Sequence, residues 1–494
     1  MKHIKKTILT FSILTLILTA NAATIAQAEE PEPGPDPFHH AVYGPYQLRA
    51  EEPEPGPDPF QCADQPYIEG LLNEFLSEAV NQYDLVKIPG PILNEMMSMG
   101  EMVEIPFINI FEEREIFSGA AEPYSALDDS VETATVKTGD QEYFEEPLPQ
   151  INAYTIGCHD PRDGCGVITF LNEENTQYEG MVSDPQIGFA VIESVSSLLK
   201  NMTGEDFAID PDCAVIYNAN AVAPIDFSEE NDPTDNIFYE MGRHAEMHEA
   251  ELMNDETSDS DETKEGNMLT KTINIVLDSD GTFYNANANT VWGRQHSVLH
   301  NVNLIYHWIE PATGGQFDID FKIVGMESWL PNSGPTNTDS DKLTNEVNGT
   351  SYYMKRHPKK NEVSFFFVGY DLTGGIAGQA GGICNLPGYD DTYGSNQTHQ
   401  KNHAIGQQVP DASGYQFATL YGRSAVMAHE IAHMLGGTHG SGQKNDCAGG
   451  VWPNVCGTTL MLSGAAGGVA PDFRQSFFSD ANDKQIKKCV SEAK

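Results

Sequence analysis

Residues 429–439 read His429-Glu-Ile-Ala-His-Met-Leu-Gly-Gly-Thr-His439, and they constrain the structure of the chain more than any other segment. A helix advances about 100° per residue, so His429 and His433 project from one face, at the spacing at which two imidazoles can hold one zinc ion. Glu430 lies on the adjoining face, where it can reach a water on the metal rather than the metal itself. Gly436 allows the helix to end in a sharp turn, which returns His439 as a third ligand. Three protein ligands leave a fourth position open for water, as in a catalytic zinc site.

Five fixed residues at these offsets arise by chance in roughly one of ten thousand chains of this composition. The pairs His244/His248 and His399/His403 have the same helical spacing but lack the glutamate, the glycine and the third histidine. We therefore interpret those two pairs as structural residues, and the 429–439 segment as the centre that binds one catalytic Zn²⁺. The residues identify no ligand set for Ca²⁺, which is left open.

The pattern His-Glu-x-x-His-x-x-Gly-x-x-His followed by a methionine resembles the metzincin zinc proteases. Met461, 22 residues after His439, is then the residue of the methionine turn, an apolar floor beneath the metal and not a ligand. Within the metzincins the chain is most similar to the adamalysin/reprolysin (ADAM-like) branch. The stretch Gly375-Ile-Ala-Gly-Gln-Ala-Gly-Gly-Ile-Cys384 is similar to that family's strand ahead of the zinc helix, and Phe478-Ser479 fits too. Gly440 stands where the family usually has an aspartate.

The resemblance implies hydrolysis of peptide bonds in protein or peptide substrates. Zinc would lower the pKa of its bound water from 15.7 towards ~7, and Glu430 would act as general base and then as general acid. His429, His433 and His439 bind only when neutral, so we expect activity to fall at acid pH.

The segment Gly375–Ile383 resembles the cleft-edge strand on which family substrates lie extended and bond through their backbone. Within it, the resemblance points to Gly378, Ala380 and Gly381 as the residues that meet the substrate.

The hydrophobic pattern of residues 268–494 predicts strands and helices in the order of a metzincin catalytic domain, and nothing disintegrin-like follows it. The expected elements are a strand at Thr272–Leu277, an amphipathic helix at Val291–Ile309, a strand with period-two alternation at Phe317–Val324, a buried strand at Val363–Val368, and then the zinc helix. We therefore predict an α+β protein: a catalytic domain with a mostly parallel twisted sheet and an active-site helix, preceded by a mixed α/β acidic prodomain.

Residues 1–28 are interpreted as a secretory signal peptide, because a basic start and the apolar run Ile8–Ala20 precede the Ala26-Gln27-Ala28 site. Cleavage after Ala22 is the alternative. No later segment reaches ~18 apolar residues, so no membrane span is predicted. We expect a secreted, extracellular monomer, with the periplasm as the alternative destination.

The chain between the signal peptide and residue 268 divides into three segments. Residues 29–61 are a Pro/Glu-rich linker, in which the repeat Ala28–Phe38 recurs as Ala50–Phe60. Residues 62–253 form the predicted acidic prodomain, and residues 254–267 an acidic linker open to proteolysis. Within the prodomain we expect a helix at Gly70–Val80, a strand at Gly166–Leu171, and a strand-to-helix transition or a helix at Ala190–Leu199; Thr155–Phe170 distantly resembles the inhibitory prodomain of adamalysins.

The formal net charge of −46 is carried almost entirely by the first half of the chain. Residues 268–494 contain 20 acidic and 16 basic residues, a net of −4, which leaves 73 − 20 = 53 acidic and 27 − 16 = 11 basic residues, a net of −42, for residues 1–267. A halophilic enzyme would carry the acidity on both halves, so we reject that interpretation of the net charge. Nucleic-acid binding is excluded because it needs a basic surface.

The eight cysteines of an exported chain are interpreted as disulfides. Cys447 and Cys456 flank a loop after the third histidine, and Cys158 and Cys165 are close enough in sequence to pair.

The family resemblance pairs Cys384 with Cys489, which leaves Cys62 and Cys213. These two either form a fourth bridge, which we favour, or leave Cys213 as a free thiol that occupies the zinc position, as in the cysteine switch of related zymogens.

The function that follows is that of a secreted zinc-dependent metalloendopeptidase, made as a zymogen whose own N-terminal prodomain is a partner. Two alternatives come from other classes. One is a zinc-containing binding or adhesion protein that has lost catalysis, and the other is an interaction protein whose working part is the acidic half. Retention of Glu430 and of an open metal position argues against the first alternative.

Overall fold

The computed structural model describes residues 62, 65–109, 113–139, 142–158, 164–184, 188–223, 269–306, 317–347, 362–373, 377–380, 403–410, 415–435, 447–448, 455–456, 486 and 490. All of them lie in one compact unit, Pro57–Lys494. The signal peptide, the Pro/Glu-rich linker at 29–61 and the acidic linker at 254–267 lie outside the described residues. We call residues 62–223 the N-terminal half and the described residues from 269 onward the C-terminal half.

The N-terminal half forms an eight-stranded sheet with the order β1-β10-β9-β8-β7-β6-β3-β2, in which every neighbouring pair is antiparallel. Its strands are β1 (Asp84–Lys87), β2 (Met102–Ile108), β3 (Arg114–Pro123), β6 (Ala153–Ile156), β7 (Cys165–Phe170), β8 (Tyr178–Asp184), β9 (Gly188–Ser194) and β10 (Cys213–Asn218). Its helices are α2 (Gln65–Phe75), α3 (Gly90–Ser98) and α4 (Val195–Thr203), followed after β10 by the short η2 (Ala219–Ala221).

Local pattern located these N-terminal elements well. The predicted strand at Gly166–Leu171 is β7, and the 190–199 segment is the strand-to-helix transition, since β9 ends at Ser194 and α4 begins at Val195. The helix expected at Gly70–Val80 is displaced: α2 starts earlier, at Gln65, and ends at Phe75.

The second sheet has seven strands in the order β14-β15-β13-β11-β12-β4-β5. Its centre is parallel: β11 (Leu269–Ser279) pairs with β12 (Phe317–Trp329) and β13 (Glu362–Val368), and β13 pairs with β15 (His403–Gln407). At one end β14 (Gly378–Ala380) is antiparallel to β15. The accompanying elements are α6 (Gly281–Asn287), η3 (Ala288–Thr290), α7 (Val291–Tyr306), α8 (Ser340–Val347), η4 (Gln416–Ala418) and α10 (Leu420–Met434), with β16 (Cys447–Ala448) and β17 (Val455–Cys456) as a separate pair. No helix among the described residues is long and apolar enough to cross a membrane.

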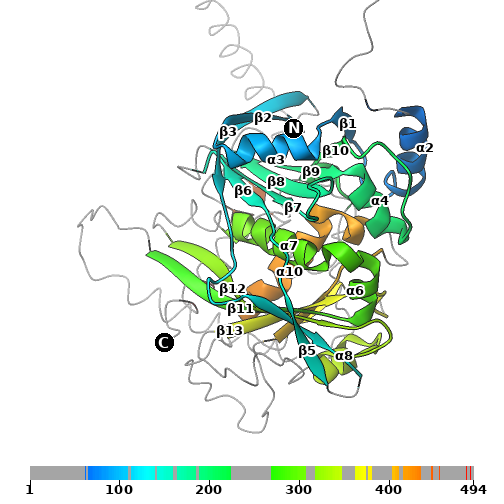
Figure 1. The fold of residues 1–494 in the computed structure, drawn as a ribbon, viewed down its shortest axis with the longest axis vertical. Coiled ribbons are helices and arrows are strands. Elements are labelled where there is room, and N and C mark those ends of the chain that lie inside the picture. The colour runs from blue at the N-terminus through cyan, green and yellow to red at the C-terminus, as the bar shows by residue number, and fades with distance from the viewer. Residues whose placement is uncertain are drawn as a thin grey trace, which may run out of the picture. The chain divides into compact units, whose positions relative to one another are not determined.

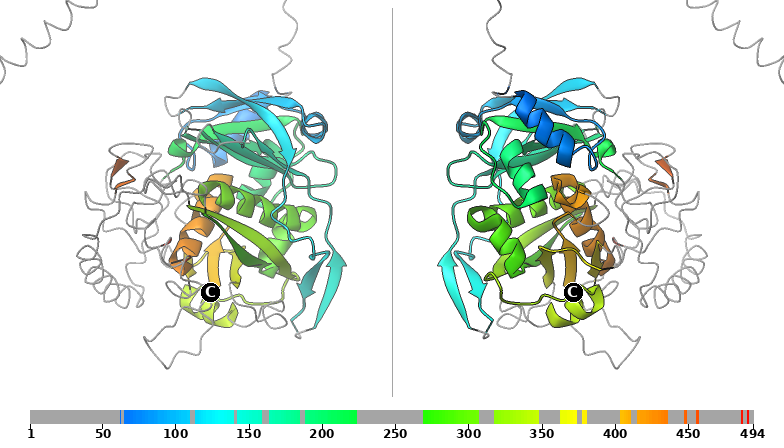
Figure 2. Two further views of the ribbon diagram at one scale, coloured as in Figure 1. Left: turned by 90° about the vertical axis from the view of Figure 1, so that its left-hand side faces the viewer. Right: turned by 90° about the vertical axis from the view of Figure 1, so that its right-hand side faces the viewer.

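Two strands of the second sheet come from the N-terminal half. β4 (Thr133–Lys137) pairs in parallel with the end of β12, and β5 (Tyr143–Pro147) is antiparallel to β4. Figure 2 shows this cyan hairpin beside the green and yellow strands of the C-terminal half. The boundary predicted near residue 268 therefore divides the chain in sequence, whereas the sheet is shared between the halves.

Lys137, at the end of β4, is buried between two carboxylates of the C-terminal half. Its ammonium group donates to Asp278 and, at 3.0 Å, to Oε2 of Glu327, and it lies 4.9 Å above the ring of Trp329. Burial raises the pKa of Asp278 to about 7, against the opposing effect of the Lys137 charge. A buried cation with two anionic partners fixes the position of this strand.

Helix α7 lies between the two sheets and is buried at all sixteen of its residues (Figure 1). The amphipathic helix predicted at Val291–Ile309 is present as α7, and its polar face is covered by the N-terminal half. The approach is close at Gly293, where an added Cβ would lie 2.6 Å from the carbonyl oxygen of Leu171.

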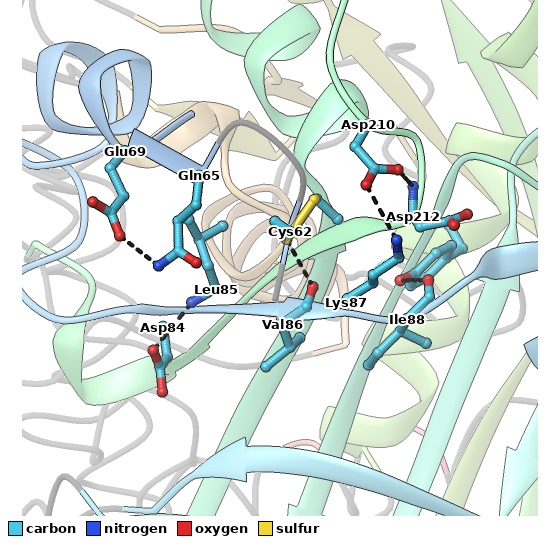
Figure 3. The surroundings of a disulfide bond; sticks show 12 residues. Cys62, Gln65, Glu69, Asp84, Leu85, Val86, Lys87, Ile88, Asp210 and Asp212 are labelled. Carbon is cyan, nitrogen blue, oxygen red and sulfur yellow. Dashed lines mark hydrogen bonds and ion pairs between the residues drawn. A yellow bond between two sulfur atoms is a disulfide. The ribbon is translucent and has the colours of Figure 1, made fainter. Parts of the chain in front are cut away.

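Two disulfides lie in the N-terminal half. Cys62, ahead of α2, is bonded to Cys213 of β10, and Figure 3 shows Cys62 beside Val86 of β1. Cys213 is therefore disulfide-bonded, as we favoured, and is not the free thiol of a cysteine switch. The second disulfide joins Cys158 to Cys165.

The remaining cysteines are less fully described. Cys447 and Cys456 are directly opposite each other in the β16–β17 pair, so their predicted bridge suits the backbone. Cys384 and Cys489 lie outside the described residues, and their pairing stays a prediction.

We predict that the Cys62–Cys213 disulfide stabilises the fold more than Cys158–Cys165, because it closes a segment of 151 residues rather than 7. In the chain-entropy model the double variant Cys62→Ala/Cys213→Ala loses about 5 kcal/mol of unfolding free energy, and Cys158→Ala/Cys165→Ala about 2 kcal/mol. Urea unfolding followed by circular dichroism measures both values. Equal losses would show that loop length does not govern them.

Candidate metal centre

The zinc helix predicted from the sequence is α10, which ends at Met434. Thr419 caps its first turn, because the hydroxyl oxygen accepts a hydrogen bond from Gly422 N at 3.0 Å. Gly422 has no room for a side chain, since a Cβ would lie 2.0 Å from the carbonyl oxygen of Gln416. The start of the helix is therefore fixed by its own sequence.

One face of α10 packs directly against the seven-stranded sheet. A Cβ at Gly406 of β15 would lie 2.9 Å from a methyl carbon of Val426 and 2.5 Å from the ring of Phe365. The missing side chain lets the helix and the strand approach closely. On another side, the hydroxyl of Tyr306, the last residue of α7, donates to the carbonyl oxygen of Ala428 at 2.9 Å.

His429 and His433 lie side by side in the buried part of this helix. Their ring centroids are 4.8 Å apart with an interplanar angle of 82°, and their Nε2 atoms are 3.2 Å apart. Two nitrogens that each lie about 2.0–2.1 Å from one tetrahedral zinc ion are separated by about 3.3 Å. The two imidazoles therefore fit a shared zinc ion without rearrangement.

The third predicted ligand, His439, lies outside the described residues, as do Gly436 and Met461. The described residues contain no group of three or more His, Cys, Asp and Glu side chains that could hold a metal. A complete ligand set therefore needs a residue beyond the described part of α10, and His439 stays the predicted one.

Glu430 is fully buried and lies against the edge strand β14. A Cβ at Gly378 would lie 2.7 Å from Cγ and 2.7 Å from Oε1 of Glu430. The structure thus brings together the predicted general base and one predicted substrate-strand residue. Ala380 follows two residues later in β14, and Gly381 lies outside the described residues.

The position of β14 is set by strand β15 and by side-chain contacts with helix α8. Gly378 is opposite Gly406 in the antiparallel pair with β15. The side chain of Gln379 donates to Asp341 of α8 at 2.7 Å and accepts from Thr344 at 3.4 Å. These contacts hold the strand that confines the Glu430 carboxyl group.

The sequence analysis missed a buried ionic cluster at the N-terminal end of α10. Arg423 donates to Oε2 of Glu179 at 2.9 Å and to Oε2 of Glu193 at 3.2 Å, and Arg294 of α7 donates to Glu179 at 2.5 Å. Oε1 of Glu193 accepts from Leu420 N at 3.0 Å, at the positive end of the helix dipole. The arginines in the two helices were the available signal, but their glutamate partner Glu179 is 115 and 244 residues away in sequence.

Burial acts strongly on this ionic cluster. It lowers the pKa of Arg294 to about 10 and holds the pKa of Glu193 above its ordinary value. Burial also raises the pKa of Glu179, but the charges of Arg294 and Arg423 outweigh this effect and keep the pKa below its ordinary value. Two acidic and two basic side chains make the cluster neutral when all four are charged.

A further histidine pair with helical spacing, His296 and His300 of α7, was not considered in the sequence analysis. Their ring centroids are 5.8 Å apart, and both side chains are buried. Like the other pairs they lack the glutamate and the glycine. Of the pairs that were considered, His403 contacts Ser364 Oγ through Nδ1 at 2.7 Å, while His399, His244 and His248 lie outside the described residues.

A buried helix with paired imidazoles, and a carboxyl group between that helix and an antiparallel strand, are features expected of a zinc metallopeptidase site. Residues 269–467 match the family model Reprolysin_5, metallo-peptidase family M12. Among solved structures, metalloproteinase-II from Bacteroides fragilis is similar, with 11% identity and a TM-score of 0.41 over 81% of this chain and 96% of that chain. No curated protein matches the chain.

We predict that Gly378→Ala lowers peptidase activity by roughly 10- to 100-fold, because the new methyl group displaces the Glu430 carboxyl group. Zinc content should stay at the wild-type level, since the added Cβ meets Glu430 and the carbonyl oxygen of Ile405 and not the histidines. The measurement is kcat/KM on one peptide together with metal analysis. Gly70→Ala is the control, because a Cβ there meets no atom within 4 Å. Wild-type activity of Gly378→Ala would show that the carboxyl group tolerates displacement.

Proposed function

We propose that the protein is a secreted zinc-dependent metalloendopeptidase, made as a zymogen. The observation that carries the proposal is the 3.2 Å separation of the His429 and His433 Nε2 atoms on a helix whose Glu430 is held against an edge strand. The M12 family match of residues 269–467 supports the zinc protease chemistry. Secretion rests on the signal peptide in the sequence, and a monomer is the simplest assembly.

The residues divide the chemistry between them. His429, His433 and His439 would hold one zinc ion, which when bound polarises a peptide carbonyl and acidifies a water molecule. Glu430 takes a proton from the attacking water and gives it to the leaving amine. Its confinement by Gly378 keeps the carboxyl group at one position through both transfers.

Strand β14 is the proposed docking edge for the substrate. Within the described residues it is the outermost strand of its sheet, and its antiparallel partner β15 occupies one side only. An extended peptide can pair with the other side through backbone hydrogen bonds, as in other cases of β-strand addition. Because Gly378 and Ala380 are small, a peptide paired with this edge can lie close to Glu430.

The zymogen proposal is supported by the way the N-terminal half covers the C-terminal half. It covers the polar face of α7 and contributes the outer hairpin of the catalytic sheet. Because α7 is amphipathic, its polar face can contact water after the N-terminal half is removed. Cross-half ion pairs at Arg423 and Lys137 favour a second candidate, in which the N-terminal half stays attached as an accessory domain.

We predict that Glu430→Gln retains zinc but loses at least roughly 10²-fold in peptide hydrolysis, because a positioned general base is removed while the ligands stay. Full-length protein, and protein cleaved between residues 254 and 267, are purified and incubated with a mixed peptide library. The incubations are made with and without a zinc chelator, and the products are analysed by mass spectrometry. Glu346→Gln, on the exposed side of α8, is the matched control. Near-wild-type turnover of Glu430→Gln with zinc present would remove Glu430 from the mechanism.

For latency, we expect residues 268–494 to be more active than the full-length chain, and the isolated N-terminal half to inhibit them when added back. One peptide substrate and the zinc content of each sample give the comparison. Equal activity without inhibition would leave the N-terminal half as an accessory domain.

A further inference from the structure

His300 occupies the junction between the two halves, where α7 meets the N-terminal sheet. Its Nε2 accepts a hydrogen bond from Ala126 N at 3.3 Å, and its Nδ1 is 2.9 Å from Oγ1 of Thr169 in β7. The ring of Tyr124 lies edge-on at a centroid distance of 4.8 Å. All three contacts belong to the N-terminal half, and the His300 side chain is 1% exposed.

These contacts require the imidazole to be neutral. A backbone N–H can only donate, so the Nε2 atom that faces Ala126 carries no proton. The single ring proton is then on Nδ1 and is donated to Thr169. A second proton on Nε2 would place two donors 3.3 Å apart and would leave a charge buried without an anionic partner.

We propose that His300 makes the union of the two halves acid-sensitive, so that its protonation weakens the junction and favours release of the N-terminal half. This inference extends the proposed zymogen function, since it names the condition under which the cover leaves. The junction itself is observed, and its response to pH can be measured whether or not the protein hydrolyses peptides.

Among the described residues, the groups that face His300 add no compensating negative charge. On its own helix the neighbour is His296, whose pKa burial lowers to about 4, and from the N-terminal half the neighbour is the phenol of Tyr124, which accepts a hydrogen bond from Asn303. Burial, with a smaller effect of His296, holds the pKa of His300 well below 6.5.

The sign of the pH effect follows from the two states of His300. In the joined state its pKa is lowered, and in the separated state it returns to about 6.5. The junction therefore has its full strength above about pH 6.5 and loses it as the pH falls. For this residue alone the dissociation constant should rise by about 30-fold between pH 7.5 and pH 5.0.

Other buried acids at the junction act in the opposite direction. The pKa values of Glu193 and Asp278 are raised by burial, so protonation of these groups favours the joined state. The His300 contribution is therefore measured as a difference between variants and not from wild type alone.

The experiment uses the full chain with one engineered protease site between residues 254 and 267. After cutting, the dissociation of the halves is measured by size exclusion and fluorescence at pH 7.5 and 5.0, with enough urea to bring it into range. His300→Gln keeps an acceptor for Ala126 and a donor for Thr169 but cannot gain a proton. The wild-type ratio of dissociation constants between the two pH values should exceed that of His300→Gln by up to about 30-fold.

His403→Gln is the matched control, because His403 is also buried and neutral but bonds to Ser364 within the C-terminal half. It should keep the wild-type pH dependence of dissociation. His300→Asn repeats the test with a shorter amide in case the glutamine variant does not fold. Equal pH ratios for wild type and the neutral variants, or halves that separate already at pH 7.5, would overturn the proposal. Peptidase activity, assayed separately after return to pH 7.5, reports on the proposed function alone.

Discussion

The buried cluster of Glu179, Glu193, Arg294 and Arg423 is the interaction on which the arrangement of this protein depends. Each of the four side chains is completely or almost completely withdrawn from water. Removing one member of such a cluster typically costs about 3–5 kcal/mol, because the remaining charges stay buried. The two glutamates come from β8 and β9, and the two arginines come from α7 and α10. The cluster therefore joins the N-terminal sheet to α7 and to the zinc helix α10.

This placement couples the N-terminal half to the zinc helix at the N-terminal end of that helix. Glu193 accepts from the first backbone N–H of α10 and pairs with Arg423, six residues before His429. The described carboxylates of the N-terminal half hold the N-terminal end of the zinc helix, and β14 confines Glu430.

The parts of the fold that the sequence predicted are those set by local pattern. The strands of the C-terminal half and the histidine spacing follow from periodicities of 2 and 3.6 residues. The addition of β4 and β5 to the second sheet does not, because it depends on Lys137 meeting Asp278 and Glu327, 141 and 190 residues away. The complete burial of α7 could not be predicted for the same reason, since its polar face is covered by a distant segment. The family resemblance pointed to Gly378 as a residue that meets the substrate. Its contact with Glu430 is between residues that are distant in sequence, so it could be seen only in the structure.

Net charge cannot hold the two halves together, because the chain is negative on both sides of residue 268, at −42 for residues 1–267 and −4 for residues 268–494. Long-range electrostatics therefore opposes their union, although salt at physiological strength screens it beyond about 8 Å. The attraction comes from short-range buried ion pairs, in which the N-terminal half supplies the acidic groups at one place and the basic group at the other. The N-terminal half contributes two glutamates to two arginines at one place, and a lysine to two carboxylates at another. Because these pairs lie away from solvent, they are sensitive to the protonation of the residues around them and much less to the acidic excess of the N-terminal surface.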